Sequence, residues 1–348
     1  MVKKLVVAAP GDLSTATGGF VYDRRLVAEL VSLGWNIEVL DLGTGFPRPT
    51  AQMRSDAAMT LAALPHGLRV VVDGLALGAL PEVAQALRDT HRLIALVHHP
   101  LALETGLSAK ESTALRASEQ AALACTRHVV ATSTTTMRIL AEDFRVPSAR
   151  LSVIEPGTDT PVTVPRWRAD VVALLAVGAV VPRKGYDVLV TALARIAHLP
   201  WRLTIAGDLS RSPATVALLR AEIAQSGLAD RIVLRGVAAA HELASLFARS
   251  DIFVLATRFE GYGMAFTEAL SHGLPVVGTK IGALEQTVPA DAGVLVPVDD
   301  AEGLADALRY LIERPEERER LAAGARASVF PSWREQATRF ATVLENLA

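Results

Sequence analysis

The chain has 348 residues, and its 35 Lys and Arg against 37 Asp and Glu leave a formal net charge of −2. This balance gives no support to nucleic acid or an anionic membrane as the main partner. At roughly 150 residues per domain, the length predicts two domains. The single cysteine, Cys125, excludes an internal disulfide, which fits a reducing cytoplasm.

The first apolar run of the chain, at 5–9, ends at Pro10. It is too short for the apolar region of a signal peptide and instead predicts a buried strand. No stretch approaches the roughly 20 apolar residues that span a bilayer. Residues 1–160 carry 15 Lys and Arg against 16 Asp and Glu, so charge does not support a membrane-binding face. We expect a cytoplasmic protein, at most peripheral at the inner membrane face.

Short apolar runs alternate with amphipathic segments through the first half of the chain. The expected strands are 5–9, 37–40, 69–72, 93–97, 129–131 and 151–154. The expected helices are 22–33, 81–88, 112–125 and 134–144, the last of them capped by Ser133. Strands that are apolar at every position predict a parallel sheet with helices on both faces.

The same alternation restarts after a segment with two prolines at 160–167, which predicts a linker. The expected strands are 171–177, 201–206, 232–235, 252–256, 276–277 and 294–295. The expected helices are 186–197, 215–226, 242–249 and 264–272, followed by a helical tail interrupted at Pro315 and Pro331 and a last helix at 333–347. The predicted domains are 1–163 and 168–330, with the segment 332–348 joined to the first domain.

The strongest functional motif is FVLATRFEGYGMAFTEAL at 253–270. It predicts a strand, a glycine-containing turn and a helix, and parallel α/β sheets bind ligands at the carboxyl ends of their strands. Exposed amides at the start of a helix suit a diphosphate. Gly261 and Gly263 allow the backbone to approach the ligand closely. Glu260 and Glu268 could both accept hydrogen bonds from sugar hydroxyls.

This motif resembles the Glu-x7-Glu signature of the retaining GT-B glycosyltransferases of family 4 (group 1). Further segments occur in the family's order: 177–189 resembles its basic diphosphate-binding loop, 203–208 its next strand and turn, and 235–237 its base-binding turn. The resemblance implies an α/β fold of two facing Rossmann-like domains. The N-terminal domain would bind the acceptor, and the C-terminal domain the nucleotide-sugar donor.

The resemblance also implies roles for single residues. Lys184 would neutralise the leaving diphosphate, Glu260 would hold the hydroxyls of the transferred sugar, and Glu268 would hold the ribose. The family usually has arginine where this chain has Ala179, and we hypothesise that Arg183 supplies the missing charge. The other expected donor-binding residues are Gly207, Gly236, Val237, Gly261, Tyr262, Gly263, Met264 and Ala265.

The first half matches the family more loosely. Gly18 and Gly19 lie in a segment that resembles the family's glycine loop, before the first expected helix. They do not form the Gly-x-Gly-x-x-Gly pattern, so dinucleotide binding has little support. His98 follows a strand at the place where the family carries a histidine near the transferred sugar, and His99 is the alternative.

Other polar residues that follow strands have two interpretations. Asp73 and Glu104 could shape an acceptor pocket or serve as an ordinary cap or loop. The His98–His99 pair raises the question of a metal, but no further His or Cys stands at ligand spacing. The chain also contains no Asp-x-Asp motif. We therefore expect no metal and no other cofactor.

The expected function is the transfer of a sugar, with retention, from a nucleoside-diphosphate sugar to a hydroxyl on a glycan, a lipid carrier or a small molecule. Fold alone does not fix function, because nucleotide-sugar epimerases and sugar phosphorylases share this architecture. A non-catalytic protein that binds nucleotide sugars is a further alternative.

Overall fold

The computed structural model describes residues 3–15, 17–104, 106–161 and 171–347. The chain divides into two compact units. Unit 1 contains Met1–Gly157 and Pro331–Ala348, and unit 2 contains Thr158–Phe330. Most of the expected linker, residues 162–167, lies outside the described residues.

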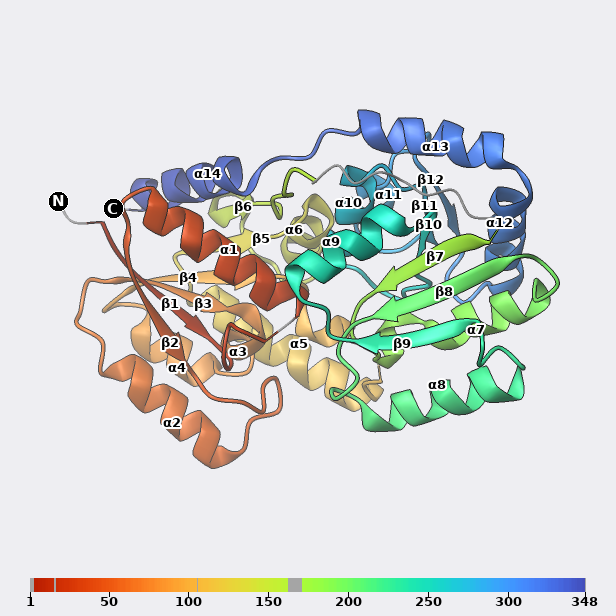
Figure 1. Cartoon of the computed structure of the whole chain (residues 1–348). Coiled ribbons are helices and arrows are strands. Elements are labelled where there is room, and N and C mark those ends of the chain that lie inside the picture. Colours follow the sequence, from red (N-terminus) through yellow and green to blue (C-terminus); the bar gives the residue numbers. More distant parts are fainter. Residues whose placement is uncertain (1–2, 16, 105, 162–170, 348) are drawn as a thin grey trace. The chain divides into compact units, whose positions relative to one another are not determined.

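Unit 1 is built on a six-stranded parallel sheet in the order β2-β1-β3-β4-β5-β6, with helices on both sides (Figure 1). The inner strands are apolar and buried because both faces are covered. The expected strands are confirmed to within one residue at each end. The strands are β1 (Lys4–Ala9), β2 (Asn36–Asp41), β3 (Arg69–Asp73), β4 (Arg92–Val97), β5 (His128–Ala131) and β6 (Leu151–Val153).

The helices of unit 1 agree less closely with the expected ranges. α5 begins before residue 112 because Ser108 and Glu111 form a capping box at its start. The expected cap on α6 is confirmed, since the Ser133 hydroxyl accepts a hydrogen bond from the amide of Thr136 at 3.0 Å. The helices are α1 (Gly18–Ser32), α2 (Ala51–Ala62), α3 (Gly74–Leu77), α4 (Pro81–Leu87), α5 (Ala109–Ala124), α6 (Thr134–Glu142) and α14 (Trp333–Asn346), with the 3-10 turns η1 (Leu101–Leu103) and η2 (Ser148–Arg150).

The structure corrects the expected start of the first helix. α1 begins at Gly18 rather than at Tyr22, because the hydroxyl of Thr17 accepts a hydrogen bond from the amide of Phe20 at 3.2 Å and caps the helix. Gly18 and Gly19, which were expected in a loop, therefore form the first turn of α1.

The last segment of the chain returns to unit 1, where α14 lies beside α1 (Figure 1). The rings of Tyr22 and Trp333 meet edge to face with their centroids 5.7 Å apart. The backbone of Trp333 packs so closely on Gly157 that a Cβ at residue 157 would lie 2.2 Å from its nitrogen. Lys3 and Glu345 add an exposed ion pair at 2.6 Å.

Unit 2 repeats the architecture with a parallel sheet in the order β12-β11-β10-β7-β8-β9. The expected strands are confirmed to within two residues at each end. The strands are β7 (Val172–Val177), β8 (Trp201–Ala206), β9 (Ile232–Gly236), β10 (Ile252–Val254), β11 (Val276–Thr279) and β12 (Gly293–Val296).

The helices of unit 2 follow the expected order, and the tail resolves into two helices before Phe330. α13 begins at Pro315, where a helix needs no amide donor. The helical elements are η3 (Pro182–Lys184), α7 (Tyr186–Arg195), α8 (Pro213–Gln225), α9 (Ala240–Arg249), α10 (Met264–Ser271), α11 (Leu284–Thr287), α12 (Ala301–Glu313) and α13 (Pro315–Ala327).

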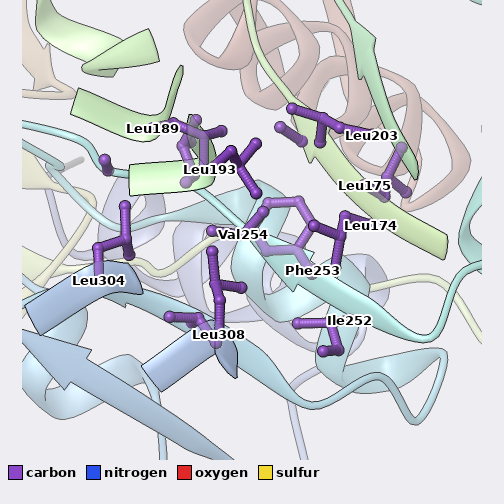
Figure 2. Packing of buried hydrophobic residues seen from close by; sticks show 14 of the residues in the cluster. Leu174, Leu175, Leu189, Leu193, Leu203, Ile252, Phe253, Val254, Leu304 and Leu308 are labelled. Atoms are coloured by element: carbon purple, nitrogen blue, oxygen red, sulfur yellow. The ribbon is translucent and has the colours of Figure 1, made fainter. Parts of the chain in front are cut away.

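The core of unit 2 centres on the strand β10 (Figure 2). The ring of Phe253 lies beside Leu174 of the neighbouring strand β7, and the leucines of α7 and α12, among them Leu189 and Leu308, point toward the sheet. All four side chains are fully buried. This packing fixes the strands whose carboxyl ends carry the predicted site. In the part of the chain that the structure describes, no helix has the length and hydropathy needed to cross a membrane.

Candidate functional site

The predicted residues of unit 2 gather at one edge of its sheet. The strands β10, β7, β8 and β9 are neighbours and parallel, so their carboxyl ends meet at that edge. Glu260 follows β10, Lys184 lies in η3 after β7, Gly207 follows β8, and Gly236 ends β9. Segments far apart in the sequence are thus brought together by the order of the strands.

An ion pair connects two of these loops. The ammonium of Lys184 donates a hydrogen bond to Glu260 Oε1 at 2.6 Å, across 76 positions of sequence. Arg183 Nη1 lies 3.9 Å from Glu260 Oε2. The three side chains are largely buried, with 14% of Lys184, 21% of Arg183 and 9% of Glu260 exposed. One carboxylate therefore faces two cations.

These cations keep the carboxyl group of Glu260 ionised. Burial opposes ionisation of the carboxyl group, but Lys184 and then Arg183 outweigh it and keep the pKa of Glu260 below its usual value. The group is a carboxylate at neutral pH and can only accept hydrogen bonds.

The backbone fixes Arg183 beside this carboxylate. Its carbonyl accepts hydrogen bonds from the amide of Arg258 at 2.8 Å and from the hydroxyl of Thr257 at 3.1 Å. Its guanidinium donates to the carbonyl of Phe259 at 2.9 Å. Arg183 is thus held beside Glu260, and its compensation for Ala179 stays a prediction.

Arg258 is a residue that the sequence reasoning missed. Its guanidinium donates to the carbonyl of Pro182 at 2.8 Å, to Asp187 at 2.6 Å and to Asp299 at 2.7 Å. It therefore joins η3, the start of α7 and the loop after β12. No local pattern marks it, because its partners lie 41 and 71 positions away.

Gly185 allows η3 to lie against the loop after β10. Its φ is +63°, and a Cβ there would lie 1.9 Å from the carbonyl oxygen of Ala256. Only glycine fits such a position without strain. The next residue, Tyr186, donates its hydroxyl to the carbonyl of Gly178 at 2.8 Å. The loop that carries Arg183 and Lys184 is thereby fixed on both sides.

The glycine turn leads into α10 as expected. Gly263 has a φ of +96° and stands at the N-cap of the helix, so the amides that follow it begin the helix. The Glu260 carbonyl accepts a hydrogen bond from the amide of Ala283 at 3.1 Å, and the Tyr262 carbonyl accepts one from the Thr287 hydroxyl at 3.0 Å. The remaining predicted residues here are half-buried: Gly261, Tyr262, Met264, Ala265 and Glu268.

The other predicted donor-binding residues lie at the ends of β8 and β9. The amide of Gly207 donates to the carbonyl of Gly236 at 2.9 Å. Val237 is 54% exposed, which is high for an apolar side chain. Ala179 is half-buried, and the next amide, that of Val180, donates to the Asp208 carbonyl at 2.9 Å.

A second cluster lies at the corresponding edge of the unit 1 sheet. His98 follows β4, and Nε2 of its ring lies 3.0 Å from Asp23 Oδ1 and 3.8 Å from Asp73 Oδ2. Asp73 ends β3 and also caps α3, since its Oδ1 accepts a hydrogen bond from the amide of Leu75 at 2.6 Å. Both carboxyl groups are buried. Gly19 packs on the ring, because a Cβ there would lie 3.2 Å from His98 Cδ2.

The protons of this cluster are tightly held. Burial opposes the charge on His98, but Asp23 and then Asp73 outweigh it and raise the pKa of His98 to about 9. Burial, followed by the charge of Asp23, raises the pKa of Asp73 to about 7. The three residues offer ligand atoms within 4.8 Å of one another, so they could also hold a cation.

Asp23 is the second residue that sequence reasoning missed. It lies inside α1 beside Tyr22 and Arg24, where an acidic residue looks like part of a solvent-facing helix surface. Only the fold brings it to His98, 75 positions away. His99 has a different setting and contacts Glu104 at 3.2 Å.

In comparison with known protein families, one family matches unit 2. Residues 164–328 match the family described as Glycosyl transferases group 1. A D-inositol 3-phosphate glycosyltransferase of Xylanimonas cellulosilytica is 34% identical over 198 residues, which are 51% of this chain and 47% of the relative. The MMP alpha-(1->4)-mannosyltransferase of Mycolicibacterium hassiacum is 28% identical over 86% of this chain and 76% of its own length. The chain thus spans about half the length of the first of these relatives.

Solved structures share the fold of the whole chain. A sucrose-phosphate synthase from Thermosynechococcus elongatus has a TM-score of 0.84 at 20% identity, with 99% of each chain covered. The Anabaena protein HepE, in complex with UDP and glucose, has a TM-score of 0.77 at 18% identity and covers 99% of this chain and 100% of its own. At these identities the likeness establishes the two-unit GT-B architecture.

Proposed function

On the premise that the match of residues 164–328 to the group 1 glycosyl transferases reflects a shared activity, we propose that the protein transfers a sugar from a nucleoside-diphosphate sugar to a hydroxyl acceptor. The proposal includes retention of the anomeric configuration and independence of metal ions. Unit 2 binds the donor, and unit 1 contributes residues for the acceptor side of the reaction.

The observation that carries this proposal is the buried arrangement of Lys184, Arg183 and Glu260 at the carboxyl ends of the strands. Lys184 and Arg183 bring two cations to Glu260, in the loop that leads into α10. Helix amides and cations favour a diphosphate, and most strongly when its negative charge grows in the transition state. A site of this kind supplies from side chains the charge that other enzymes take from a metal ion.

Lys184 can serve the carboxylate and the donor at once. An ammonium has three N–H donors, and one of them is directed to Glu260 in the structure. In this proposal the same ammonium also donates to phosphate oxygens of the bound donor. Glu260 stays ionised beside it and accepts hydrogen bonds from hydroxyls of the transferred sugar. Glu268 on α10 binds the ribose in this proposal.

The chemical step needs no separate strong base. The bond between the anomeric carbon and the phosphate oxygen breaks, and the acceptor oxygen bonds to the same face of that carbon. The acceptor proton passes to an oxygen of the departing phosphate, so all charges balance. Lys184 and Arg183 stabilise the nucleoside diphosphate as it leaves.

Similar proteins support a nucleotide-sugar donor without fixing its identity. HepE has been solved with UDP and glucose and with UDP-glucose. The relatives include a D-inositol 3-phosphate glycosyltransferase and a lipopolysaccharide core biosynthesis mannosyltransferase, whose names point to no common acceptor. The acceptor of this protein therefore has to be found by experiment.

The test begins with thermal unfolding in the presence of UDP, GDP and ADP and their sugars, with EDTA throughout. A ligand at 100 times its Kd stabilises the fold by about 2.7 kcal/mol. The stabilising donor is then incubated with pooled hydroxyl acceptors, and the product's anomeric configuration is read by NMR. We expect release of the nucleoside diphosphate and a retained configuration without added metal.

Other outcomes would assign other functions. An altered sugar on the nucleotide without any acceptor would indicate an epimerase, and a sugar phosphate formed from inorganic phosphate would indicate a phosphorylase. Tight binding of the donor without turnover against every acceptor would favour a non-catalytic protein. Stabilisation by none of the nucleotides would overturn the proposal.

A further inference from the structure

Asp23 has no role in the function proposed above, yet its side chain is buried and held in contact with His98. Only 2% of the residue is exposed, and its Oδ1 lies 3.0 Å from Nε2 of His98. Among the described residues, its Oδ2 is buried and receives no hydrogen bond from a protein donor. A buried carboxylate needs a compensating charge, which the imidazole supplies, and the protonated side chain of Asp73 also hydrogen-bonds to Asp23.

The ring of His98 is held on several sides. Asp23 of α1 and Asp73 at the end of β3 are the charged groups that face it. Tyr22 meets the ring edge to face with the centroids 5.2 Å apart and is neutral, because burial raises its pKa well above the usual value. Gly19 packs against Cδ2 of the ring. These contacts fix the orientation of the imidazole.

The protonation of Nε2, the nitrogen of His98 that lies near both aspartates, determines which hydrogen bonds the ring can make. Nε2 faces both carboxylates and must carry a hydrogen to bond with Asp23. Because the buried side chain of Asp23 lies 3.0 Å from this nitrogen and that of Asp73 lies 3.8 Å away, the ring keeps its second proton at neutral pH, which agrees with a pKa of about 9. His98 in this state cannot accept a proton from an acceptor hydroxyl. It can donate a hydrogen bond from Nδ1, and the side chain as a whole is 18% exposed.

We propose that Asp23 is a positioning residue that holds His98 as an imidazolium through Nε2 and leaves Nδ1–H as a fixed hydrogen-bond donor to an oxygen of the bound substrate. This inference rests on the proposed sugar transfer. In this role His98 is a positively charged hydrogen-bond donor, and Asp23, which lies inside α1, keeps it protonated.

The first test needs no substrate. The ring resonances of His98 are followed by NMR in EDTA-treated protein from pH 5 to pH 10, with His98→Gln used for assignment. We expect the wild-type ring to stay protonated through pH 8, and Asp23→Asn to lower the midpoint by more than one pH unit. Glu104→Gln, which alters the neighbouring pair with His99, is the matched control and should leave the His98 midpoint in place.

The second test uses kinetics with the donor identified above. We expect kcat/KM of the wild type to be flat between pH 6 and pH 8. In Asp23→Asn it should fall as the pH rises, with the midpoint seen by NMR, and it should recover at low pH. A residue with a purely structural role would lower activity at every pH alike. Asp23→Glu, which keeps the charge, should restore the flat profile.

Several results would overturn the inference. A wild-type His98 midpoint at or below pH 6.5 would do so without any variant, even if Asp23→Asn did not fold. So would a kinetic midpoint unrelated to the NMR midpoint, or ring resonances that shift when Mg²⁺, Mn²⁺ or Zn²⁺ is added to metal-free protein, because His98 would then be a metal ligand. Failure of the proposed function would instead appear as absence of transfer by the wild type.

Discussion

The two charged clusters, one at the sheet edge of each unit, use similar residue types in opposite proportion. In unit 2, Lys184 and Arg183 face the single carboxylate of Glu260. In unit 1, Asp23 and Asp73 face the single imidazole of His98. Among the described residues, the unit 2 cluster holds more cations than carboxylates, which suits an anionic ligand, whereas the buried acidic side chains of the unit 1 cluster retain a proton. The same strand-end geometry thus gives one cluster suited to a diphosphate and another suited to holding a charged donor.

The largest effect is expected from removing Lys184. Lys184→Met leaves the buried Glu260 with only the more distant Arg183, which should lower the free energy of unfolding by about 3 kcal/mol. Loss of a cation that stabilises the leaving diphosphate should reduce kcat by roughly 100-fold or more. Urea unfolding and the transfer assay measure the two quantities.

Two further variants isolate the cause. In Lys184→Met combined with Glu260→Gln, most of the stability should return while turnover stays low, because no buried carboxylate lacks its closest cation and Arg183 keeps its hydrogen bond to the carbonyl of Phe259. Lys3→Met removes an ion pair of the same 2.6 Å length, but Lys3 and Glu345 are 47% and 49% exposed. It should cost less than about 1 kcal/mol. Equal losses from Lys184→Met and Lys3→Met would contradict the argument from burial.

The second-largest effect is expected in the pH dependence of the free energy of unfolding, which the unit 1 cluster should cause. The pKa of His98 is raised to about 9 and that of Asp73 to about 7, so the folded state binds both protons more tightly than the unfolded state. The resulting stability is complete below the unfolded pKa of each group and is lost as the pH rises through the folded value. Between pH 6.5 and pH 9 the free energy of unfolding should therefore fall, by an amount on the order of 2 kcal/mol.

Urea unfolding at pH 6.5, 7.5 and 9 measures this loss, and Asp23→Asn provides the comparison. Without the carboxylate of Asp23, the His98 proton is lost at lower pH, so the variant should show a smaller decline over the same range. A wild-type stability that increases from pH 6.5 to pH 9 would show that the cluster does not retain its protons.

The smallest effect comes from two adjacent glycines in the first turn of α1. A Cβ at Gly18 would meet no atom within 4 Å, whereas a Cβ at Gly19 would press on the His98 ring. Gly18→Ala should stabilise unit 1 by about 0.5 kcal/mol, because alanine is the better helix former. Gly19→Ala should gain less and should shift the His98 ring resonances. Identical behaviour of the two variants would argue against close packing of Gly19 on the ring.

Most of the fold follows from the sequence because the strands are buried on both faces. Their continuous apolar runs, such as 69–72 and 93–97, need no long-range information to be recognised. α2 was not predicted, because it buries only Ala57 and Leu61 and its apolar residues show little helical periodicity. The start of α1 was misplaced because two glycines oppose helix formation locally, while the cap at Thr17 and tertiary packing favour it.

The candidate site was predictable where its signals are local. Glu260, Gly263 and Glu268 lie in one strand–turn–helix segment, and Lys184 lies in a basic loop after another strand, so the rule about strand ends brought them together. Asp23 and Arg258 lack such a signal. Their roles depend on partners 41 to 76 positions away, and contacts at that distance exist only once the sheet has formed.

The return of α14 to unit 1 has a consequence for biosynthesis. Unit 2 is continuous in sequence, so all of its residues are translated before Trp333. Unit 1 is completed only afterwards. Until α14 has been translated, it does not cover the surface of α1 around Tyr22 or the backbone at Gly157. Nascent unit 1 therefore exposes an apolar face for the whole time needed to make unit 2, and this interval is when chaperones would have most to protect.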